Sequence, residues 1–194
     1  MAKDLLGKIL LLRRPGSPEL AARIVETEAY MGVTDRAAHS CNGRRTARTA
    51  VLYGPGGGVY IYLIYGMYAC VNLVCNRPDI PQAALIRAVE PMTGLEEMCK
   101  ARFGCTPLEL IDKKGAKALA QLSNGPGKLC RALSLTPKES GLDVFNSYIH
   151  VGADSTPSAF EVVQTTRIGV DYAGEDALLP YRYYIKENPF VSKL

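Results

Sequence analysis

The stretch Gly54–Val74 limits what this chain can fold into more than any other part of the sequence. A glycine-rich start leads into two apolar runs, Val59–Ile64 and Met67–Val74, which Tyr65 and Gly66 separate. Both runs are rich in β-branched and aromatic residues, and a two-residue gap that ends in glycine is typical of a β-hairpin. The turn would force a positive φ on Tyr65 or Gly66, which glycine accepts and a bulky tyrosine resists. A tyrosine at such a tip therefore indicates a partner outside the chain.

Further tyrosines lie on the two predicted strands. Tyr60, Tyr62 and Tyr68 each have an ordinary explanation as aromatic residues of a sheet. Alternation nevertheless places Tyr60 and Tyr62 on one face of the first strand, while Tyr65 projects from the end of the hairpin. An aromatic platform beside a projecting wedge suits a protein that stacks nucleic-acid bases.

The composition is that of a globular protein. The 194 residues are 47% hydrophobic and 22% charged, so we expect one domain with a real core. A net charge of +4 is too small to demonstrate a polyanionic partner, and local clusters of charge are more informative. The apolar run Ile9–Leu12 is too short for a signal sequence or a membrane span. We therefore expect an intracellular protein with no membrane partner, in the cytoplasm or nucleoid of a bacterium or the nucleus of a eukaryote.

Three familiar kinds of site are poor matches. Six cysteines without a secretory signal are expected to be free thiols rather than disulfides. No C-x-x-C spacing occurs and the two histidines lie far apart, so no metal site is expected. The glycines before the hairpin are not followed by a helix or by Lys-Ser/Thr, which argues against a P-loop or a dinucleotide fold.

The rest of the chain predicts strands at both ends and helices in the middle. The predicted strands are Lys8–Arg13, Glu19–Tyr30, Gln82–Glu90 with Pro91 as its end, Tyr148–Val151, Glu161–Thr166 and Tyr181–Lys186. The predicted helices are Asp35–His39 capped by Thr34, Gly94–Phe103, Pro107–Asp112, Ala116–Leu122 and Lys128–Leu133. Strands without regular βαβ alternation indicate an α+β fold around an antiparallel sheet.

Two carboxylates lie on the predicted strand Glu19–Tyr30. Alternation places Ile24, Glu26, Glu28 and Tyr30 on one face, which sets the two carboxylates about 7 Å apart. Solvent could face them, but carboxylates that share a poorly solvated sheet face with an aromatic residue are typical of a general acid or base. The spacing does not decide between Glu26 and Glu28.

A lone arginine on another predicted strand bears on this choice. Alternation places Leu85, Arg87 and Val89 on one face of Gln82–Glu90. An arginine in an apolar strand usually pairs with a carboxylate, and either Glu26 or Glu28 is a candidate partner. Near the other end of the chain, Ile168 is expected in the core.

Two segments offer cations and backbone donors to phosphate groups. The loop Ser40–Ala50 holds Arg44, Arg45 and Arg48 among hydroxyl and amide side chains, which suits either a solvated loop or DNA phosphates. The segment Asn124–Lys128 opens a helix, so free backbone N–H groups and a lysine converge there. A plain helix start explains that segment equally well.

Several motifs in order resemble one family across nearly the whole chain. They are RIVETEAYMGVTDRAAHS (Arg23–Ser40), VYIYLIYGMYACVN (Val59–Asn72), ALIRAVEP (Ala84–Pro91), GPGKLC (Gly125–Cys130) and RIGV followed by AG (Arg167–Gly174). The chain resembles the alkyladenine, or 3-methyladenine, DNA glycosylases. The resemblance implies one α+β domain over residues 1–194, with a curved antiparallel β-sheet, surrounding helices and a protruding hairpin that enters the minor groove of DNA.

The resemblance also implies an activity. A monofunctional enzyme would bind double-stranded DNA as a monomer, flip a damaged purine out of the helix and hydrolyse its N-glycosidic bond, which initiates base excision repair. The damaged purines would include 3-methyladenine, hypoxanthine and ethenoadenine, and no cofactor or metal would be needed. No residue that could protonate a neutral leaving base is evident.

Roles follow for individual residues that match the family's motifs. Glu28 matches the general base that activates water, and Arg87 the residue that helps to hold that water. Tyr30 and His39 match one side of the base pocket, Tyr62 the stacking partner on the other side, and Asn72 the side chain that disfavours guanine's 2-amino group. Tyr65 matches the intercalating wedge. The residues that we expect to contact the DNA backbone are Arg44, Arg48, Met67, Gly125 and Lys128.

The basic loop CNGRRTARTA is the most individual stretch, which leaves the details of DNA contact open. Two other functions also remain open. One is a non-catalytic nucleic-acid-binding module in which the carboxylates are structural, and the other is a hydrolase of free nucleosides that uses the same carboxylate.

Overall fold

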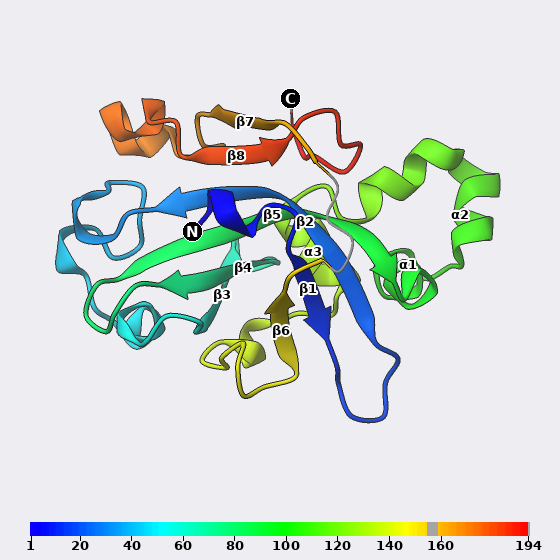
Figure 1. The fold of residues 1–194 in the computed structure, drawn as a ribbon, viewed down its shortest axis with the longest axis horizontal. Coiled ribbons are helices and arrows are strands. Elements are labelled where there is room, and N and C mark those ends of the chain that lie inside the picture. Colours follow the sequence, from blue (N-terminus) through cyan, green and yellow to red (C-terminus); the bar gives the residue numbers. More distant parts are fainter. Residues whose placement is uncertain (155–158, 194) are drawn as a thin grey trace.

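A long strand, β2 (Leu20–Tyr30), runs through the middle of the antiparallel sheet on which this fold is built (Figure 1). The structure is a computed structural model that describes residues 1–154 and 159–193. The other strands are β1 (Ile9–Leu12), β3 (Val59–Ile64), β4 (Tyr68–Cys75), β5 (Gln82–Thr93), β6 (Ile149–Gly152), β7 (Val162–Thr165) and β8 (Arg182–Ile185). The α-helices are α1 (Leu95–Phe103), α2 (Pro107–Lys114) and α3 (Pro126–Ala132). Short 3₁₀ helices cover Lys3–Leu5, Gly32–Thr34, Cys41–Gly43, Ala50–Tyr53, Ala116–Leu122, Pro137–Glu139 and Asp171–Leu178.

The curled sheet forks at β2. Its main path has the order β3-β4-β5-β2-β1-β6, and every pairing is antiparallel. One edge of β2 pairs with β5, whereas the other edge pairs first with β1 and then, from Glu26 to Glu28, with β8. The α+β fold with a curved antiparallel sheet that the sequence predicts is therefore confirmed. The fork brings the C-terminal strands against the part of β2 that carries the two carboxylates.

Two of the three irregularities in the β2–β5 pairing lie between Ile24 and Thr27 and change which side chains share a face. The register passes from Ile24–Val89 to Glu26–Ala88 and then to Thr27–Ile86, so it skips Val25 on β2 and Arg87 on β5. Such bulges turn side chains to new directions and are frequent beside active sites. The prediction that Ile24 shares a face with Glu26 and Glu28 is therefore wrong. The prediction that Val89 shares a face with Leu85 and Arg87 is also wrong. Ile24 and Val89 instead belong to the main hydrophobic core.

That main core lies between the sheet and the helices. Met98 and Cys99 of α1, Leu110 of α2 and Leu129 of α3 are buried in it against residues of β1 to β5. A second, smaller cluster joins β2 and β5 to the C-terminal strands. It consists of Leu6, Val25, Ala88, Tyr184, Ile185 and Val191. The two clusters place helices on one side of β2 and β5 and the β7–β8 pair on the other, as the green helices and the orange and red strands of Figure 1 show.

The hairpin of β3 and β4 projects from the sheet. The two strands pair from Val59–Leu73 to Ile64–Tyr68, but β5 pairs with β4 only from Asn72 onward. The outer half of the hairpin therefore has no further strand beside it in the described structure. At the tip, Tyr65 has φ 53° and Gly66 has φ 68°, which confirms the positive φ that the sequence predicts for this turn. The backbone of Tyr65 is strained at this φ, and its side chain is 86% exposed, so contacts within the protein do not offset the strain.

The predicted helix Asp35–His39 is wrong. The chain forms a 3₁₀ turn over Gly32–Thr34 instead, and the Asp35 carboxylate accepts hydrogen bonds from the backbone N–H groups of Met31 and Ala37. An aspartate that bonds nearby N–H groups offers the backbone an alternative to a helix.

The predicted end of a strand at Pro91 is also wrong, because β5 continues to Thr93. Pro91 pairs with Ala22 of β2, while β4 pairs with β5 only as far as Leu85. One edge of β5 therefore has no partner strand at Pro91 in the described structure. A proline, which lacks a backbone donor, is tolerated at such an edge.

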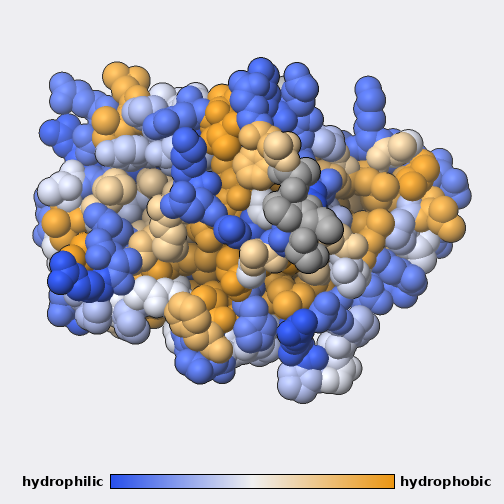
Figure 2. Space-filling view, viewed as in Figure 1, coloured by the Kyte–Doolittle hydropathy of each residue, from blue (hydrophilic) through white to orange (hydrophobic). Residues whose placement is uncertain are grey.

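The surface mixes polar and apolar residues. On the face in Figure 2, hydrophobic residues cross the middle and reach the region of α2, where Leu108 is 73% exposed. All six cysteines are free thiols, and three of them are buried. In the described part of the chain, no helix combines the length and the apolar character needed to cross a membrane.

Candidate active site

A cleft of about 800 Å³ opens between the hairpin, the basic loop and the segment that follows β7. Its lining includes Tyr30, His39, Tyr62, Tyr65, Arg87 and Ile168. A small recess of about 40 Å³ shares Tyr30, His39 and Tyr62 with the cleft and adds Tyr60 and Asn72. The structure thus gathers residues from distant parts of the sequence around one hollow, and the sequence predicts a site role for most of them.

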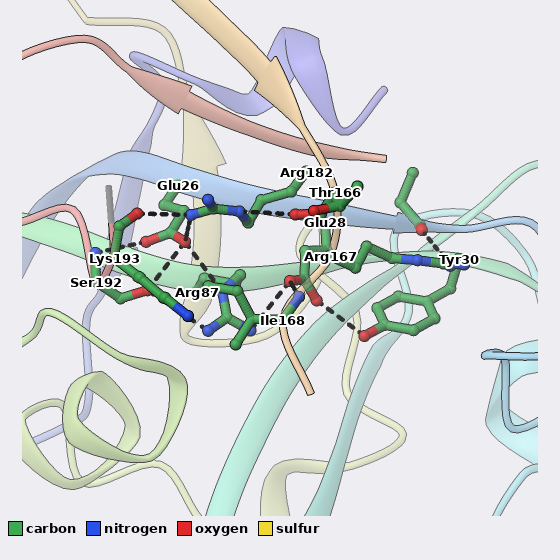
Figure 3. Close-up of polar contacts among 11 residues, drawn as sticks. Glu26, Glu28, Tyr30, Arg87, Thr166, Arg167, Ile168, Arg182, Ser192 and Lys193 are labelled. Carbon is green, nitrogen blue, oxygen red and sulfur yellow. Dashed lines mark hydrogen bonds and ion pairs between the residues drawn. The ribbon is translucent and has the colours of Figure 1, made fainter. Parts of the chain in front are cut away.

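Glu28 is fully buried, and the groups that bind it come from residues that line this cleft. Figure 3 shows its polar contacts. Its Oε1 accepts hydrogen bonds from the backbone N–H of Ile168 at 2.8 Å and contacts Arg87 Nη1 at 3.1 Å. Its Oε2 accepts a hydrogen bond from the Tyr30 hydroxyl at 2.8 Å. The three groups that hold the carboxylate all belong to residues that line the cleft. The arrangement fixes both oxygens of Glu28 and places them one layer below the hollow. Ile168 is thus half-buried in the wall of the cleft rather than in the core as predicted.

Arg87 joins the two carboxylates of β2. Its Nη1 faces Glu28, while its Nε donates a hydrogen bond to Oε1 of Glu26 at 3.1 Å. Burial alone lowers the pKa of the Arg87 guanidinium, but the charges of Glu28 and Glu26 outweigh this effect and raise it. Because the bulge in β5 falls at Arg87, its side chain leaves the ordinary alternation of the strand and points at both acids. The predicted pairing of Arg87 with Glu26 or Glu28 is therefore realised with both.

A buried ion pair between Arg167 and Asp35 packs against the ring of Tyr30. The guanidinium of Arg167 binds Asp35 through two contacts, at 2.6 and 2.9 Å, and its Cζ lies 5.0 Å from the centre of the Tyr30 ring. A guanidinium over an aromatic face is attracted by the electrons of the ring. Burial, and next the charge of Glu28, raise the pKa of Tyr30 well above its ordinary value. Tyr30 therefore remains a phenol and a donor to Glu28.

Aromatic rings form the other wall. Tyr60 and Tyr62 stack at 5.5 Å between ring centres, which confirms that they share a face of β3. His39 meets Tyr62 edge-on at 4.4 Å, and its Nδ1 is hydrogen-bonded to the Tyr60 hydroxyl at 2.9 Å. Burial, and then the positive charges of Arg48 and Arg44, lower the pKa of His39 to about 4. The imidazole is consequently neutral near pH 7.

Asn72 lines the recess, and backbone carbonyl groups fix its side chain. Its Nδ2 donates hydrogen bonds to the carbonyl oxygens of Tyr60 at 3.1 Å and Cys70 at 3.2 Å. These two bonds use both amide protons, so the acceptor oxygen of the side chain is the group left for a ligand. The orientation of the Asn72 side chain is set before any ligand arrives.

The predicted DNA-backbone residues lie on both sides of the hairpin. Arg44 lines the cleft, whereas Met67 and Lys128 line a separate groove of about 520 Å³ on the other side. Lys128 donates a hydrogen bond to Asn124 Oδ1 at 2.7 Å, and Gly125 is the residue before the first turn of α3. Arg48 is exposed, and its charge acts on His39. Arg44, Met67 and Lys128 thus line the two hollows that flank the hairpin.

Several residues that support the site are not evident from the sequence. Arg167 lies in a motif quoted above, but nothing in that motif shows that it pairs with Asp35 across 132 positions. The hydroxyl of Tyr172, a further cleft residue, donates a hydrogen bond to the Ala37 carbonyl at 3.0 Å. Ser192, near the end of the chain, binds Glu26, and no local pattern marks it. Among the described residues, no group of three or more His, Cys, Asp or Glu side chains is arranged to hold a metal ion.

The sequence as a whole matches a known protein family. Residues 1–189 match the family described as Methylpurine-DNA glycosylase. The chain belongs to this family. A relative from Alkaliphilus oremlandii, named "Putative 3-methyladenine DNA glycosylase", is 46% identical over 193 residues, which are 100% of this chain and 93% of the relative. Relatives of the same name from Clostridium novyi and Methanocella arvoryzae are 44% and 46% identical and are covered over 92% and 90% of their own lengths.

Membership of the methylpurine-DNA glycosylases makes this protein an enzyme. It acts on DNA as an N-glycosylase in base excision repair, and the predicted family is confirmed. The cleft with its buried Glu28–Arg87–Tyr30 network is therefore the candidate active site of a DNA glycosylase.

Proposed function

We propose that this methylpurine-DNA glycosylase releases alkylated and deaminated purines of the 3-methyladenine, hypoxanthine and ethenoadenine type from duplex DNA, with Glu28 as the general base. The proposal rests on one observation above all. Glu28 is a carboxylate held by three donors under an aromatic cleft, beside an exposed tyrosine on a projecting hairpin. No step in this chemistry requires a metal or an organic cofactor.

The first step is extrusion of the damaged nucleotide. Stacking in a duplex hides the glycosidic bond, and flipping a base out costs a few kcal/mol, least for a base that pairs poorly. Tyr65 would fill the gap that the base leaves, because its ring is exposed at the tip of a hairpin whose outer half has no further strand beside it in the described structure. The resulting preference for weakly paired purines would be one source of selectivity.

The second step is capture of the base. Tyr62 would stack on one face of the purine, with Tyr30 and His39 on the other side. His39 and Tyr62 touch edge-on at 4.4 Å, which leaves no space for a stacked base between these two rings as they stand. Binding would therefore separate them. Asn72, fixed in the lining of the recess, would disfavour purines that carry a 2-amino group by steric conflict.

The third step is hydrolysis. As the glycosidic bond breaks, positive charge builds on the sugar, and the buried charge of Glu28 would stabilise it. Glu28 would also take a proton from a water that Arg87 helps to hold, and this water would attack the face opposite the leaving base, as in an inverting glycosidase. The Tyr30 hydroxyl, Arg87 and Ile168 cover the carboxylate, so the water must reach Oε2 through a shift of that cover.

DNA would be held through phosphate contacts on both sides of the hairpin. Arg44 and Arg48 would bind DNA phosphates near the cleft. Lys128, Met67 and the backbone at Gly125 would contact the DNA backbone near the second groove. One copy of residues 1–194 would suffice as a single glycosylase domain, so the enzyme would act as a monomer. An enzyme of genomic DNA would also work inside the cell.

A panel of duplex oligonucleotides tests this function. Hypoxanthine, 3-methyladenine and ethenoadenine should each be released from duplexes without added metal, leaving an abasic site that alkali cleaves. Undamaged duplex and the corresponding free nucleosides should remain intact. Binding without base release would favour a non-catalytic module, and activity confined to nucleosides would favour a nucleoside hydrolase; either result would refute the proposal.

A further inference from the structure

Glu26 is the centre of a second polar network that adjoins the active site. The side chain is fully buried, and its Oε1 accepts hydrogen bonds from Arg87 Nε at 3.1 Å, Arg182 Nη1 at 2.9 Å and Ser192 Oγ at 2.9 Å. Its Oε2 accepts a hydrogen bond from the backbone N–H of Ser192 at 2.7 Å. Glu26 has four donors around it, whereas Glu28 has three. The Glu26 carboxylate therefore has less capacity left to accept a proton from a reacting water.

The C-terminal segment 188–193 reaches this network from outside the sheet. Val191 packs into the second hydrophobic cluster, and Arg182 Nη1 also donates a hydrogen bond to the carbonyl of Lys193 at 2.8 Å. These contacts place Ser192 where its backbone and side chain both bind Glu26. Figure 3 shows Ser192 and Lys193 on the side of Glu26 away from Tyr30.

The same serine touches Arg87 directly. Arg87 Nη2 lies 3.5 Å from Ser192 Oγ, while Nε binds Glu26 and Nη1 faces Glu28. Each nitrogen of this guanidinium thus has a separate partner. A planar guanidinium with one edge fixed has its opposite corner fixed as well, because its donors have a rigid geometry. The contacts to Glu26 and Ser192 therefore set the direction of Nη1.

Charge balance supports the same conclusion. Within this buried group, the negative charges of Glu26 and Glu28 face the positive charges of Arg87 and Arg182. Loss of one donor to Glu26 would leave a buried carboxylate to draw Arg87 more strongly toward itself and away from Glu28.

We propose that Ser192 and Glu26 are positioning residues for catalysis, and that Ser192 thereby links the C-terminal segment 188–193 to the active site. Glu26 and Ser192 act through Arg87, which they hold against Glu28 and its water. This inference rests on the proposed function, because it assumes that Glu28 and Arg87 perform the hydrolysis.

Replacement of Ser192 tests the inference. Ser192→Ala should lower the single-turnover rate constant for hypoxanthine release about 10-fold, since a hydrogen bond to a charged group is worth roughly that factor or more. The dissociation constant for lesion duplex should stay within about twofold, because Ser192 is not among the residues that line the cleft. Ser192→Thr, which keeps the hydroxyl, should restore the rate. If the alanine variant is too unstable to purify, Ser192→Cys, a weak donor of similar volume, probes the same contact.

Asn188→Ala is the matched control. Asn188 tethers the same segment through a hydrogen bond to Glu90 at 3.2 Å, away from Arg87. If the segment matters only for folding, Asn188→Ala and Ser192→Ala should lower the melting temperature alike and leave the rate constant under enzyme excess unchanged. That outcome would overturn the inference.

A double-mutant cycle identifies the route of the effect. In an Arg87→Lys background, which lacks the guanidinium group that contacts Ser192 and Glu26, Ser192→Ala should slow cleavage by less than about twofold, because the residue through which it acts has changed. Full additivity would contradict action through Arg87. Glu28→Gln, measured alongside, separates the two hypotheses: an active Glu28→Gln variant refutes the proposed function, whereas an inactive one with a fully active Ser192→Ala refutes only the positioning role.

Discussion

Glu26 and Glu28 are two residues apart on one strand, yet their surroundings assign them different tasks. Glu26 is bound by two arginines and by Ser192 and faces away from the cleft, whereas Glu28 lies under it. Both carboxylates are buried where β2 pairs with β5 and β8. The difference arises from partners that lie far away in the sequence.

Replacement of Glu26 by glutamine should destabilise the fold. The change leaves Arg87 and Arg182 without one of their buried countercharges, and removal of one partner from a buried pair costs about 3–5 kcal/mol. Urea unfolding would measure the loss of unfolding free energy. Glu19→Gln is the control, since the Arg13–Glu19 pair is exposed and a surface pair contributes only about 0–1 kcal/mol. Equal effects of the two substitutions would contradict the role of Glu26 as a buried centre.

His39 should make stability depend on pH. Its pKa falls from 6.5 in the unfolded chain to about 4 in the folded protein, so between these values the unfolded chain binds more protons. The free energy of unfolding should consequently decrease as pH falls from about 6.5 to 4, and His39 should contribute no slope above that window. Urea unfolding at several pH values would show a smaller decrease for His39→Gln than for the parent enzyme. An equal decrease in the unfolding free energy of the two proteins between pH 6.5 and 4 would contradict a depressed pKa of His39.

At the scale of elements, the hairpin is the part that the sequence predicts best. Its strands alternate, its turn ends in glycine, and the positive φ of Tyr65 follows from the two-residue gap. All of these signals are local. The bulges at Val25 and Arg87 depend instead on how β2 and β5 pair. The alternation that places Ile24 beside the acids and Val89 beside Arg87 therefore gives the wrong face. The turn at Asp35 likewise depends on Arg167, which lies 132 positions away.

The hairpin tip carries its own prediction. Tyr65→Ser should weaken base flipping and slow cleavage, because the hydroxymethyl group cannot fill the gap in the duplex. The melting temperature should not fall, since Tyr65 is 86% exposed and has a strained φ. Fluorescence of 2-aminopurine placed beside the lesion would report the flipping equilibrium. The same equilibrium in the variant and the parent would exclude the wedge role.

At the scale of the whole molecule, a modest net charge of +4 conceals a local concentration of cations. Arg44 and Arg48 lie beside the cleft and Lys128 beside the second groove, on opposite sides of the hairpin. A duplex that receives the hairpin would meet positive charge on both sides. The family and the fold class are evident from motifs along the chain, but this distribution is visible only once the loops are folded around the hairpin.

Salt should weaken DNA binding accordingly. Substitution of Arg44, Arg48 or Lys128 by alanine should each reduce the slope of log affinity against log salt by about 1, because each cation that contacts a phosphate releases about one counterion. Lys186→Ala is the matched control, since Lys186 is exposed at the end of β8 and pairs with Glu161. Fluorescence anisotropy with a labelled lesion duplex would give the slopes. A slope that changes as much for Lys186→Ala as for the other three would contradict the proposed DNA-binding face.

Hydrolysis by Glu28 is most directly tested by single-turnover release of hypoxanthine from a duplex by Glu28→Gln beside the parent enzyme. Glutamine keeps the shape of the side chain but removes the base and the negative charge, and loss of a general base alone costs about 10²–10⁴-fold. The rate constant should therefore fall by at least that range, while the affinity for lesion duplex is kept, because the aromatic lining of the cleft is unchanged. A Glu28→Gln enzyme that releases hypoxanthine at close to the parent rate would show that this carboxylate does not drive the reaction.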